Sequence, residues 1–472
     1  MSELPSGWSY FSLNDLGGLS GGKTPSKANP AFWSSPDVPW MSPKDMKRNL
    51  LEDAEDRISQ VAVAEASMAL YPAGSVLMVT RSGILQHTFP VALAGTELTV
   101  NQDIKVLRPV EGIAPKFAFY LLKSHGGEIL SACSKDGTTV QSIDSEKLEA
   151  FQFPLPPFSE QTRITQKLDE LLAQVDTLKA RIDGIPALLK RFRQSVLAAA
   201  VSGRLTEEWR AQNFGCVDEG GPITEPASSS LPVGWSSKTA SDICGFITKG
   251  TTPSKEKMTA GHGEVPYIKV YNLTFTGALD FSIDPTFVDS STHSTDLKRS
   301  IVKPGDVLMN IVGPPLGKVS IVPATYPEWN INQAIARFRA GDEISAAYLA
   351  LCLRTDEVLS HAISRAKATA GQFNLTLEIC RELPLPVPPA EEQTEIVRRV
   401  EQLFAFADQL EAKVASAKSR IDHLTQSILA KAFRGELVPQ DPNDEPASVL
   451  LERIKAQRAA APKAKRGRKA SA

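Results

Sequence analysis

The feature that most constrains this chain is an internal repeat, because the motifs of its first half return in the same order in its second half. The matched motifs are Leu-Pro-x-Gly-Trp at 4–8 and 231–235, Thr-Pro-Ser-Lys at 24–27 and 252–255, Gly-x-Val-Leu-Met at 74–78 and 305–309, Asn-Gln-x-Ile at 101–104 and 332–335, and Pro-x-Pro-Pro-x-x-x-Gln at 154–161 and 386–393. A repeat of this length sets the whole architecture. The 472 residues therefore predict two copies of one domain rather than a single large core.

Each copy has the mixed pattern of an α+β domain. Short apolar and β-branched runs such as 75–79 and 307–311 are bounded by glycine and proline, which is typical of strands and turns. The segments 117–123 and 348–354 have the pattern of short amphipathic helices. The boundaries that we expect are 1–157 for a first domain, 158–205 for a first helix, 206–230 for a linker, 231–389 for a second domain, 390–438 for a second helix, and 439–472 for a basic, flexible tail.

A heptad pattern follows each Pro-Pro pair, with apolar residues at alternating spacings of four and three. Its positions are Ile164, Leu168, Leu171, Val175, Leu178, Ile182, Ile185, Leu189, Phe192 and Val196 in the first copy, and Ile396, Val400, Leu403, Ala407, Leu410, Val414, Ala417, Ile421, Leu424 and Ile428 in the second. Because an apolar heptad line needs a partner to pack against, the fold that we expect is α/β (α+β), with two tandem, pseudo-symmetric domains separated by two long coiled-coil helices. The alternative is that each helix packs on its own domain, but that arrangement usually has a wider apolar stripe.

Glycine and proline predict where the two helices are interrupted or end. Gly184 and Pro186 lie inside the first heptad segment, so we expect a kink or break there. Gly203 and Gly435 occupy matched places after the two segments, where a helix often ends in a left-handed cap.

The order of these features resembles a known family, the specificity subunits of type I restriction-modification systems. The residues that carry the resemblance are Leu-Pro-Pro-x-x-x-Gln at 155–161, Leu-Leu-Lys-Arg-Phe-Arg-Gln-Ser-Val-Leu at 188–197 followed by Ala200 and Gly-Arg-Leu at 203–205, and the second instance Gln-Ser-Ile-Leu-x-x-Ala-Phe-x-Gly-Glu-Leu at 426–437. The resemblance extends from Leu4 to Leu437.

The resemblance implies a chain that reads DNA without catalysing a reaction. In that family each repeated domain is a target recognition domain for one half of a bipartite site in double-stranded DNA. The two helices of the family are paired antiparallel, set the spacer between the half-sites and dock two methyltransferase (M) subunits, which restriction (R) subunits then join. S-adenosylmethionine is expected in the methyltransferase partner, ATP and Mg in the restriction partner, and no cofactor in this chain.

Polar and basic side chains in glycine-rich or proline-rich loops are the candidates for DNA contact, because phosphates and base edges require donors and acceptors. The candidates are Lys23, Thr24, Ser26, Lys27, Lys44, Lys47, Arg81, Lys135, Thr138, Thr139 and Gln141 in the first domain, and Lys249, Thr251, Thr252, Ser254, Lys255, Lys269, Tyr271, Asn272, Lys318, Arg365, Lys367 and Gln372 in the second. The alternative for each is a solvated loop residue. Motifs shared by both copies, Asn101-Gln102 and Asn332-Gln333 above all, favour a structural role, since a shared residue cannot explain why two domains read different sequences.

Other functions have less support in the sequence. Residues 17–24 satisfy the P-loop pattern, but Pro25 and Pro30 follow where its helix should begin. The five cysteines and six histidines lack metal-ligand spacing, so we expect no metal. No membrane-length apolar run or signal sequence is visible, so we expect a cytoplasmic protein. A scaffold that binds protein instead of DNA remains the alternative, because a net charge of −2 does not itself indicate a nucleic-acid partner.

Overall fold

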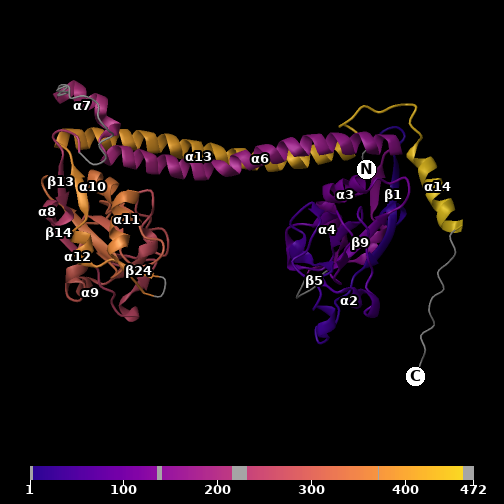
Figure 1. Ribbon diagram of the computed structural model, residues 1–472, viewed down its shortest axis with the longest axis horizontal. Helices are drawn as coiled ribbons and strands as arrows, with labels where there is room; N and C mark the ends of the chain where they lie inside the picture. Colours follow the sequence, from indigo (N-terminus) through magenta and orange to yellow (C-terminus); the bar gives the residue numbers. More distant parts are fainter. Residues whose placement is uncertain (1–3, 136–140, 215–230, 370–371, 461–472) are drawn as a thin grey trace. The chain divides into compact units, whose positions relative to one another are not determined.

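The chain folds into two compact units that each contain one α+β domain and one end of a pair of long helices. The computed structural model describes residues 4–135, 141–214, 231–369 and 372–460. The first unit comprises residues 1–182 and 416–472, and the second comprises residues 183–415. The two long helices, α6 (Phe158–Val201) and α13 (Ala390–Phe433), contribute to both units (Figure 1). No helix among the described residues is long and apolar enough to cross a membrane.

The first domain is built on a five-stranded sheet of order β2-β9-β6-β7-β4. Its strands are β2 (Gly17–Gly21), β9 (Ile104–Pro109), β6 (Val76–Val79), β7 (Val91–Ala94) and β4 (Leu50–Leu51). The smaller sheets are β5 (Arg57–Ile58) with β3 (Val38–Met41) and β8 (Thr99–Val100), β1 (Ser9–Ser12) with β12 (Gln152–Leu155), and β10 (Ser134–Lys135) with β11 (Ser142–Ile143). The helices are α1 (Leu13–Leu16), α2 (Gln60–Glu65), α3 (Pro115–Ser124), α4 (Gly126–Cys133) and α5 (Ser145–Ala150).

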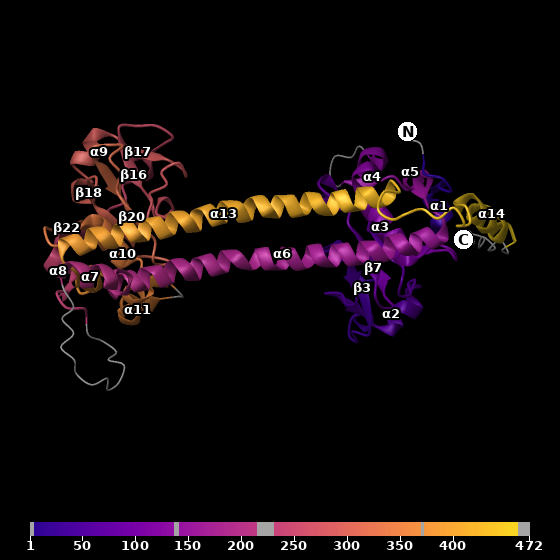
Figure 2. The same cartoon turned by 90° about the horizontal axis from the view of Figure 1, so that it is seen from above.

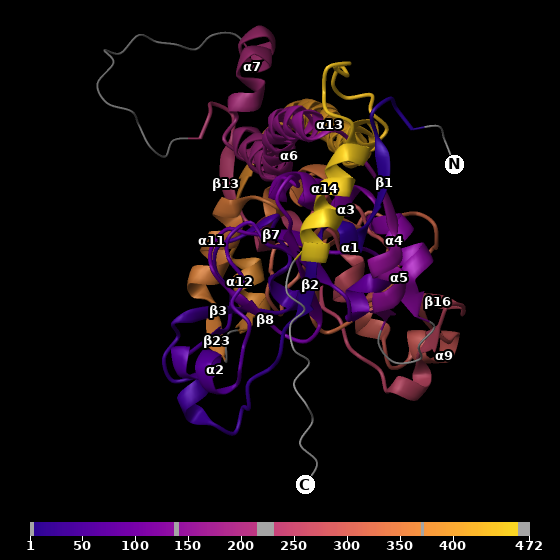
Figure 3. The same cartoon turned by 90° about the vertical axis from the view of Figure 1, so that its right-hand side faces the viewer.

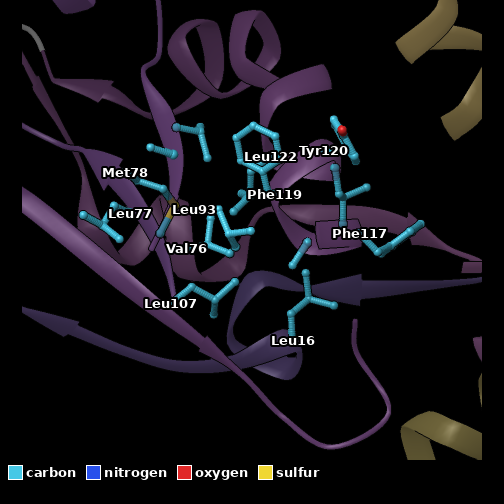
Figure 4. Close-up of a cluster of buried hydrophobic side chains, with 14 of the residues drawn as sticks. Leu16, Val76, Leu77, Met78, Leu93, Leu107, Phe117, Phe119, Tyr120 and Leu122 are labelled. Atoms are coloured by element: carbon cyan, nitrogen blue, oxygen red, sulfur yellow. The ribbon is translucent and has the colours of Figure 1, made fainter. Parts of the chain in front are cut away.

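The core of the first domain lies between its main sheet and α3. All four residues of β6 are buried, as are Phe117, Phe119 and Leu122 of α3 (Figure 4). Burial of both faces explains why Val76–Val79 is an uninterrupted apolar run rather than an alternating one.

The second domain repeats this topology in a four-stranded sheet of order β14-β22-β19-β20. Its strands are β14 (Cys244–Lys249), β22 (Ile335–Ala340), β19 (Val307–Asn310) and β20 (Val319–Ile321). A second sheet contains β15 (Thr259–Ala260), β17 (Thr286–Val288), β16 (Val265–Ile268), β21 (Trp329–Ile331) and β18 (Ile301–Val302), and two pairs are β13 (Ser236–Thr239) with β25 (Pro384–Val387) and β23 (Lys367–Thr369) with β24 (Gln372–Asn374). The helices are α8 (Ala240–Ile243), α9 (Ser290–Ser294), α10 (Ala346–Leu353), α11 (Asp356–Arg365) and α12 (Leu377–Arg381).

The two long helices pack against each other in opposite directions. In the first unit, Ile164 and Leu168 of α6 share a hydrophobic cluster with Ile428 of α13, and Lys179 forms an ion pair with Asp422 at 3.2 Å. The second unit contains the end of α6 and the beginning of α13. There, Val196 of α6 shares a cluster with Ile396 and Val400 of α13, and Arg193 contacts Asp408 at 2.6 Å and Glu411 at 2.8 Å. The beginning of each helix therefore lies beside the end of the other, so the two predicted coiled-coil helices are antiparallel (Figure 2).

The predicted heptad line is buried unevenly. Ile164, Leu168, Val175, Leu189, Val196, Ile396, Val400, Ala407, Ile421 and Ile428 are buried. Leu171, Ile182, Leu403, Leu410 and Val414 are partly buried. Leu178 and Leu424 are 46% and 45% exposed, so at these two predicted heptad positions the side chain retains a large solvent-facing surface.

Three expectations about the helical segments differ from the structure. A kink or a break was predicted near Pro186, and a break is absent, because α6 continues through it; a single proline removes one hydrogen bond, which the neighbouring turns can tolerate. The tail predicted to be flexible from 439 contains α14 (Ala447–Ala460), whose Ala447, Leu450 and Ile454 are buried in the first core (Figure 3). The segment predicted as a linker also begins with a helix, α7 (Glu207–Phe214).

Both helix ends close against the Leu-Pro-x-Gly-Trp motif of a domain. Gly203 follows α6 with φ +76°, and a Cβ there would lie 2.5 Å from Pro232 Cγ. Gly435 follows α13 with φ +76°, and a Cβ there would lie 2.6 Å from Pro5 Cγ. Both positions therefore require glycine for its positive φ and for the close approach. The end of α6 is thus fastened to the second domain, and the end of α13 to the first.

A buried glutamate at the start of each long helix accepts a hydrogen bond from the tryptophan of the same motif. Trp8 Nε1 donates to Glu160 Oε2 at 3.0 Å, and Trp235 Nε1 donates to Glu392 Oε2 at 2.8 Å. The surroundings of the second carboxylate oxygen, Oε1, differ between the two glutamates. Glu392 Oε1 accepts from Thr206 Oγ1 at 2.7 Å and from Arg210 Nη2 at 2.8 Å. Within the described part of the chain, Glu160 Oε1 is buried without a hydrogen-bond partner.

This difference predicts opposite effects of one substitution in the two copies. Burial raises the pKa of Glu160, although the Trp8 hydrogen bond and the charge of Arg163 oppose that shift. Its ionised form therefore costs stability above the unfolded pKa of a glutamate, and this cost disappears as the pH falls below that value. Glu160→Gln should raise the free energy of unfolding at pH 7, on the order of 1 kcal/mol, with less gain at pH 4. Glu392→Gln should lower it by about 1–3 kcal/mol, because Arg210 loses its carboxylate.

Urea unfolding of both variants at pH 7 and pH 4 measures this contrast. Equal destabilisation by the two substitutions at pH 7 would contradict the asymmetry of the carboxylates.

Candidate nucleic-acid interface

A rigid loop that carries four of the candidate residues follows strand β2 in the first domain. The loop turns at Gly22, where a Cβ would lie 1.8 Å from the carbonyl oxygen of Val100. Lys23 N donates to that same oxygen at 3.1 Å, and Thr24 Oγ1 donates to Gln102 Oε1 at 2.5 Å. These contacts hold the loop backbone against β8 and the turn that follows it.

Aromatic side chains hold the same loop from its other side. Trp40 Nε1 donates to Lys23 O at 3.0 Å, Trp33 Nε1 donates to Ser26 O at 3.2 Å, and Tyr71 Oη donates to Gly21 O at 2.9 Å. With its carbonyls occupied, the backbone is fixed while the side chains of Lys23, Thr24, Ser26 and Lys27 stay exposed. Lys23, Ser26 and Lys27 can thus present donors to a phosphate backbone at low entropic cost, whereas the hydroxyl of Thr24 already donates to Gln102.

The second domain builds the same loop after β14. A Cβ at Gly250 would lie 2.1 Å from Ile331 O, and Thr251 N donates to that oxygen at 3.2 Å. Tyr267 occupies the place of Trp40 on the matching strand, and its hydroxyl donates to Thr251 O at 2.9 Å. Burial raises the pKa of Tyr267 to about 12, so the hydroxyl keeps its proton and remains a donor. Lys249, Thr251, Thr252, Ser254 and Lys255 are exposed.

A strand end and a hairpin extend the surface beside the first loop. Thr80 N and Arg81 N donate to Asp103 O, in the same turn as Gln102. Arg81 also forms an isolated bridge with Ser142, which pairs with Lys135 in β10–β11. Ser82 N donates to Gln141 O at 3.1 Å. Lys23 to Lys27, Arg81, Lys135 and Gln141 therefore belong to one connected surface.

The second domain has the same succession of loop, turn, strand end and hairpin. Ile311 N donates to Ala334 O at 2.8 Å, in the turn beside Thr251. Val312 bridges to Asn374 of the β23–β24 hairpin, and Gly313 N donates to Phe373 O. Two sequences that differ at most positions thus place the same four backbone elements together.

Other candidates lie on neighbouring elements and already have partners. Lys44 follows β3 and contacts Asp56 at 2.9 Å, while Lys269 follows β16 and contacts Asp284 at 3.3 Å. Tyr271 Oη donates to the same aspartate at 2.5 Å. Ion pairs this exposed are weak, so a phosphate can compete for the lysines. Lys47 is exposed beside Lys44.

Two second-domain candidates are not linked to the loop by these interactions. Lys318 lies over the ring of Phe275 at 5.9 Å, and Arg365 pairs with Glu382 at 2.9 Å. Thr138 and Thr139 lie outside the described residues, as do the side chains of Lys367 and Gln372.

Asn272 is a wrong candidate for DNA contact. Its side chain is fully buried, and its amide donates to Asp280 O at 3.1 Å and to Ile283 O at 2.8 Å while accepting from Lys269 N. A buried amide with its partners inside the protein shapes the turn rather than facing a ligand. Asn101 is also buried and bonded to Asp103, which fits the structural role favoured for the shared Asn-Gln motif.

The sequence did not identify the aromatic residues that hold the loops. A signal was available, since Trp40 and Tyr267 stand at matched places. Each is the last residue but one of its strand, β3 for Trp40 and β16 for Tyr267. Aromatic residues in strands are usually assigned to a core, and their polar N–H and O–H groups become informative only when their acceptors are known.

Comparison with known proteins agrees with this repeated architecture. The family model for the type I restriction modification DNA specificity domain matches residues 5–187 and 232–417, which together cover more than half of the chain. The chain belongs to this family. Its curated relatives include the EcoBI specificity subunit of Escherichia coli, 38% identical over 352 residues that cover 70% of this chain and 69% of the relative. The EcoKI specificity subunit of Escherichia coli strain K12 is 34% identical over 378 residues, covering 78% and 76%.

Solved structures share the fold of this specificity-family member at lower identity. The HsdS subunit from Thermoanaerobacter tengcongensis is 19% identical, with a TM-score of 0.55 over 92% of this chain and 98% of that chain. A chain from a structural study of assembly and conformational transition in the type I R-M system is also 19% identical, with a TM-score of 0.64 over 92% of this chain and 100% of that chain.

The rigid loop of the first domain predicts that alanine substitutions at two nearby glycines, Gly22 and Gly18, have very different effects on affinity for DNA. Gly22→Ala should displace the loop from Val100 and lower affinity for specific DNA at least tenfold, because its four exposed side chains lose their positions. Gly18→Ala, on β2 with no atom within 4 Å of the added Cβ, should leave affinity within twofold. Fluorescence anisotropy with the cognate duplex measures both. Equal affinities for the two variants would show that the loop is not part of the interface.

Proposed function

We propose that this protein is the DNA sequence-specificity subunit of a type I restriction-modification complex, in which each domain reads one half of a bipartite site. The observation that carries the proposal is the repeated loop. Both domains hold an exposed Lys-, Thr- and Ser-bearing loop on a fixed backbone, at the same place beside the same sheet. The surrounding side chains differ between the copies, so two different half-sites can be read from one scaffold.

The helix pair supports a measuring role. Two copies of one domain can meet duplex DNA in opposite orientations, because a duplex has twofold axes of its own. Each helix begins at one domain through its buried glutamate and ends against the other domain's proline. The length of continuous helix between those attachments sets the spacer between the half-sites.

The proposal includes partners that perform the chemistry. Methyltransferase subunits dock along the helices, where Leu188 and Phe406 are 60% and 54% exposed, and restriction subunits join that assembly. S-adenosylmethionine belongs to the methyltransferase subunits, and ATP and Mg belong to the restriction subunits. The specificity subunit itself acts as a non-catalytic adaptor that positions them on DNA.

The experiment that tests the function is selection of duplexes by the complex of this chain with its methyltransferase subunits. We expect recovery of two constant half-sites separated by a spacer of fixed length and variable sequence. The affinity should fall steeply with salt, because phosphate contacts release counterions. Enrichment of no sequence, or of a single uninterrupted site, would reject the proposal in favour of a protein-binding scaffold.

A change of helix length tests the measuring role separately. One heptad inserted at matched places in α6 and α13 lengthens each helix by about 10.5 Å, which corresponds to roughly three base pairs. We expect the selected spacer to grow by that amount while both half-sites stay the same. One heptad inserted into α6 alone is the control, and it should disrupt the pairing and abolish specific binding. An unchanged spacer in the double insertion would show that the helices do not set the distance.

A further inference from the structure

A concavity lined by two tryptophans adjoins the DNA-reading loop of the first domain. Its volume is about 580 Å³, and its wall consists of Lys27, Pro30, Trp33, Ser34, Trp40 and Asp56. Lys27 is the last residue of the loop, so the concavity is continuous with the proposed interface. This inference therefore rests on the proposed function and refines it.

The concavity is rigid because a small core of its own supports it. Trp33 and Trp40 meet edge to face with ring centroids 5.5 Å apart, and both belong to a cluster with Phe32 and Ile58. The 3-10 turn Pro30–Phe32 is held in place by a hydrogen bond that Ser59 Oγ donates to Ala31 O at 2.7 Å. A wall built in this way does not have to be ordered when a ligand arrives.

The walls offer an apolar surface and little capacity for hydrogen bonds. Each indole has one donor, and both donors already bind the loop, to Lys23 O and Ser26 O. The carboxylate of Asp56 contacts Lys44 at 2.9 Å, which balances its charge. What remains is mainly the partly exposed ring of Trp33, with the edge of the buried Trp40, beside the hydroxyl of Ser34 and the exposed cation of Lys27. Such a site suits an apolar group carried on a polyanion.

The segment that follows the loop in the second domain does not repeat the aromatic residues of the first. The residues between Lys255 and β16 include Glu256 and Lys257 but no aromatic residue. Lys257 instead forms an ion pair with Asp296. A feature present beside one loop and missing beside the other can distinguish the half-sites, which the shared Thr-Pro-Ser-Lys motif cannot do.

We propose that the Trp33 and Trp40 surface reads a thymine in the half-site of the first domain, by contact with its C5-methyl group. The methyl group is the one apolar group that the base pairs present in the major groove. Lys27 would hold a neighbouring phosphate and bring the base edge to the rings. The first half-site then contains an A·T pair at which loss of the thymine methyl group lowers the affinity for DNA.

Replacement of thymine by deoxyuridine tests this inference, because it removes the methyl group and nothing else. The probe is the duplex selected by the methyltransferase complex, with each thymine replaced in turn. We expect one thymine in the first half-site at which the replacement lowers affinity roughly fourfold, the factor for withdrawing one methyl group from an apolar site. A first half-site without such a thymine overturns the inference.

Two variants of Trp33 separate the apolar wall from the support of the loop. Trp33→Phe keeps a ring and removes the donor to Ser26, so sensitivity to deoxyuridine should persist. Trp33→Gln keeps an N–H donor and removes the ring. Its affinity for the deoxyuridine duplex should equal that of the wild type, and it should no longer bind the thymine duplex more tightly than the deoxyuridine duplex. A Trp33→Gln variant that still prefers thymine fourfold, or loses affinity equally for every duplex, overturns the inference.

Replacements in the second half-site provide the control, and neither variant should alter their effect. Failure of the inference also stays distinct from failure of the proposed function. A wild-type complex that selects a bipartite site but is indifferent to every thymine methyl group rejects only the role of the tryptophans. A complex that selects no site rejects the function itself.

Discussion

The attachment of each domain to the helix pair depends on one buried hydrogen bond, from a tryptophan indole to a glutamate at the first turn of a long helix. Trp8 with Glu160 and Trp235 with Glu392 join the start of a domain to the helix that follows its end. Burial of a carboxylate costs free energy that donors offset, fully at Glu392 and only in part at Glu160. The bond therefore fixes both the position of the domain's first strand and the direction in which the helix leaves it.

The same junctions show how a repeated sequence becomes two different environments. Thr206 and Arg210 complete the donors around Glu392, whereas the segment after α13 brings Asp444 to Arg163 at 2.6 Å. Helix α14 adds a further difference by placing Leu450 against Gly112 in the first domain. The second domain has Glu343 before Ile344 where the first has Gly112 before Ile113. Each helix end is thereby matched to one domain.

Sequence reasoning was most successful where a short pattern has one physical meaning. Gly203 and Gly435 were placed correctly as helix ends, because few other residues adopt a left-handed conformation there. It was less successful where a neighbour decides the outcome. Pro186 is a helix breaker in isolation, yet α6 continues through it. Asn272 is a residue type that often contacts DNA, but here it is buried, and its amide donates to the carbonyls of Asp280 and Ile283 in the following turn.

The sequence by itself determined the architecture, since tandem motifs and a heptad spacing leave few ways to bury their apolar residues. It also determined which loops are shared by the two domains. Only the tertiary structure decided how those loops are held, because the residue pattern does not show which loop carbonyl each of Trp33, Trp40 and Tyr267 reaches. It likewise decided that residues from 447 form a packed helix, since burial of Leu450 and Ile454 requires a surface that the tail's own composition does not reveal.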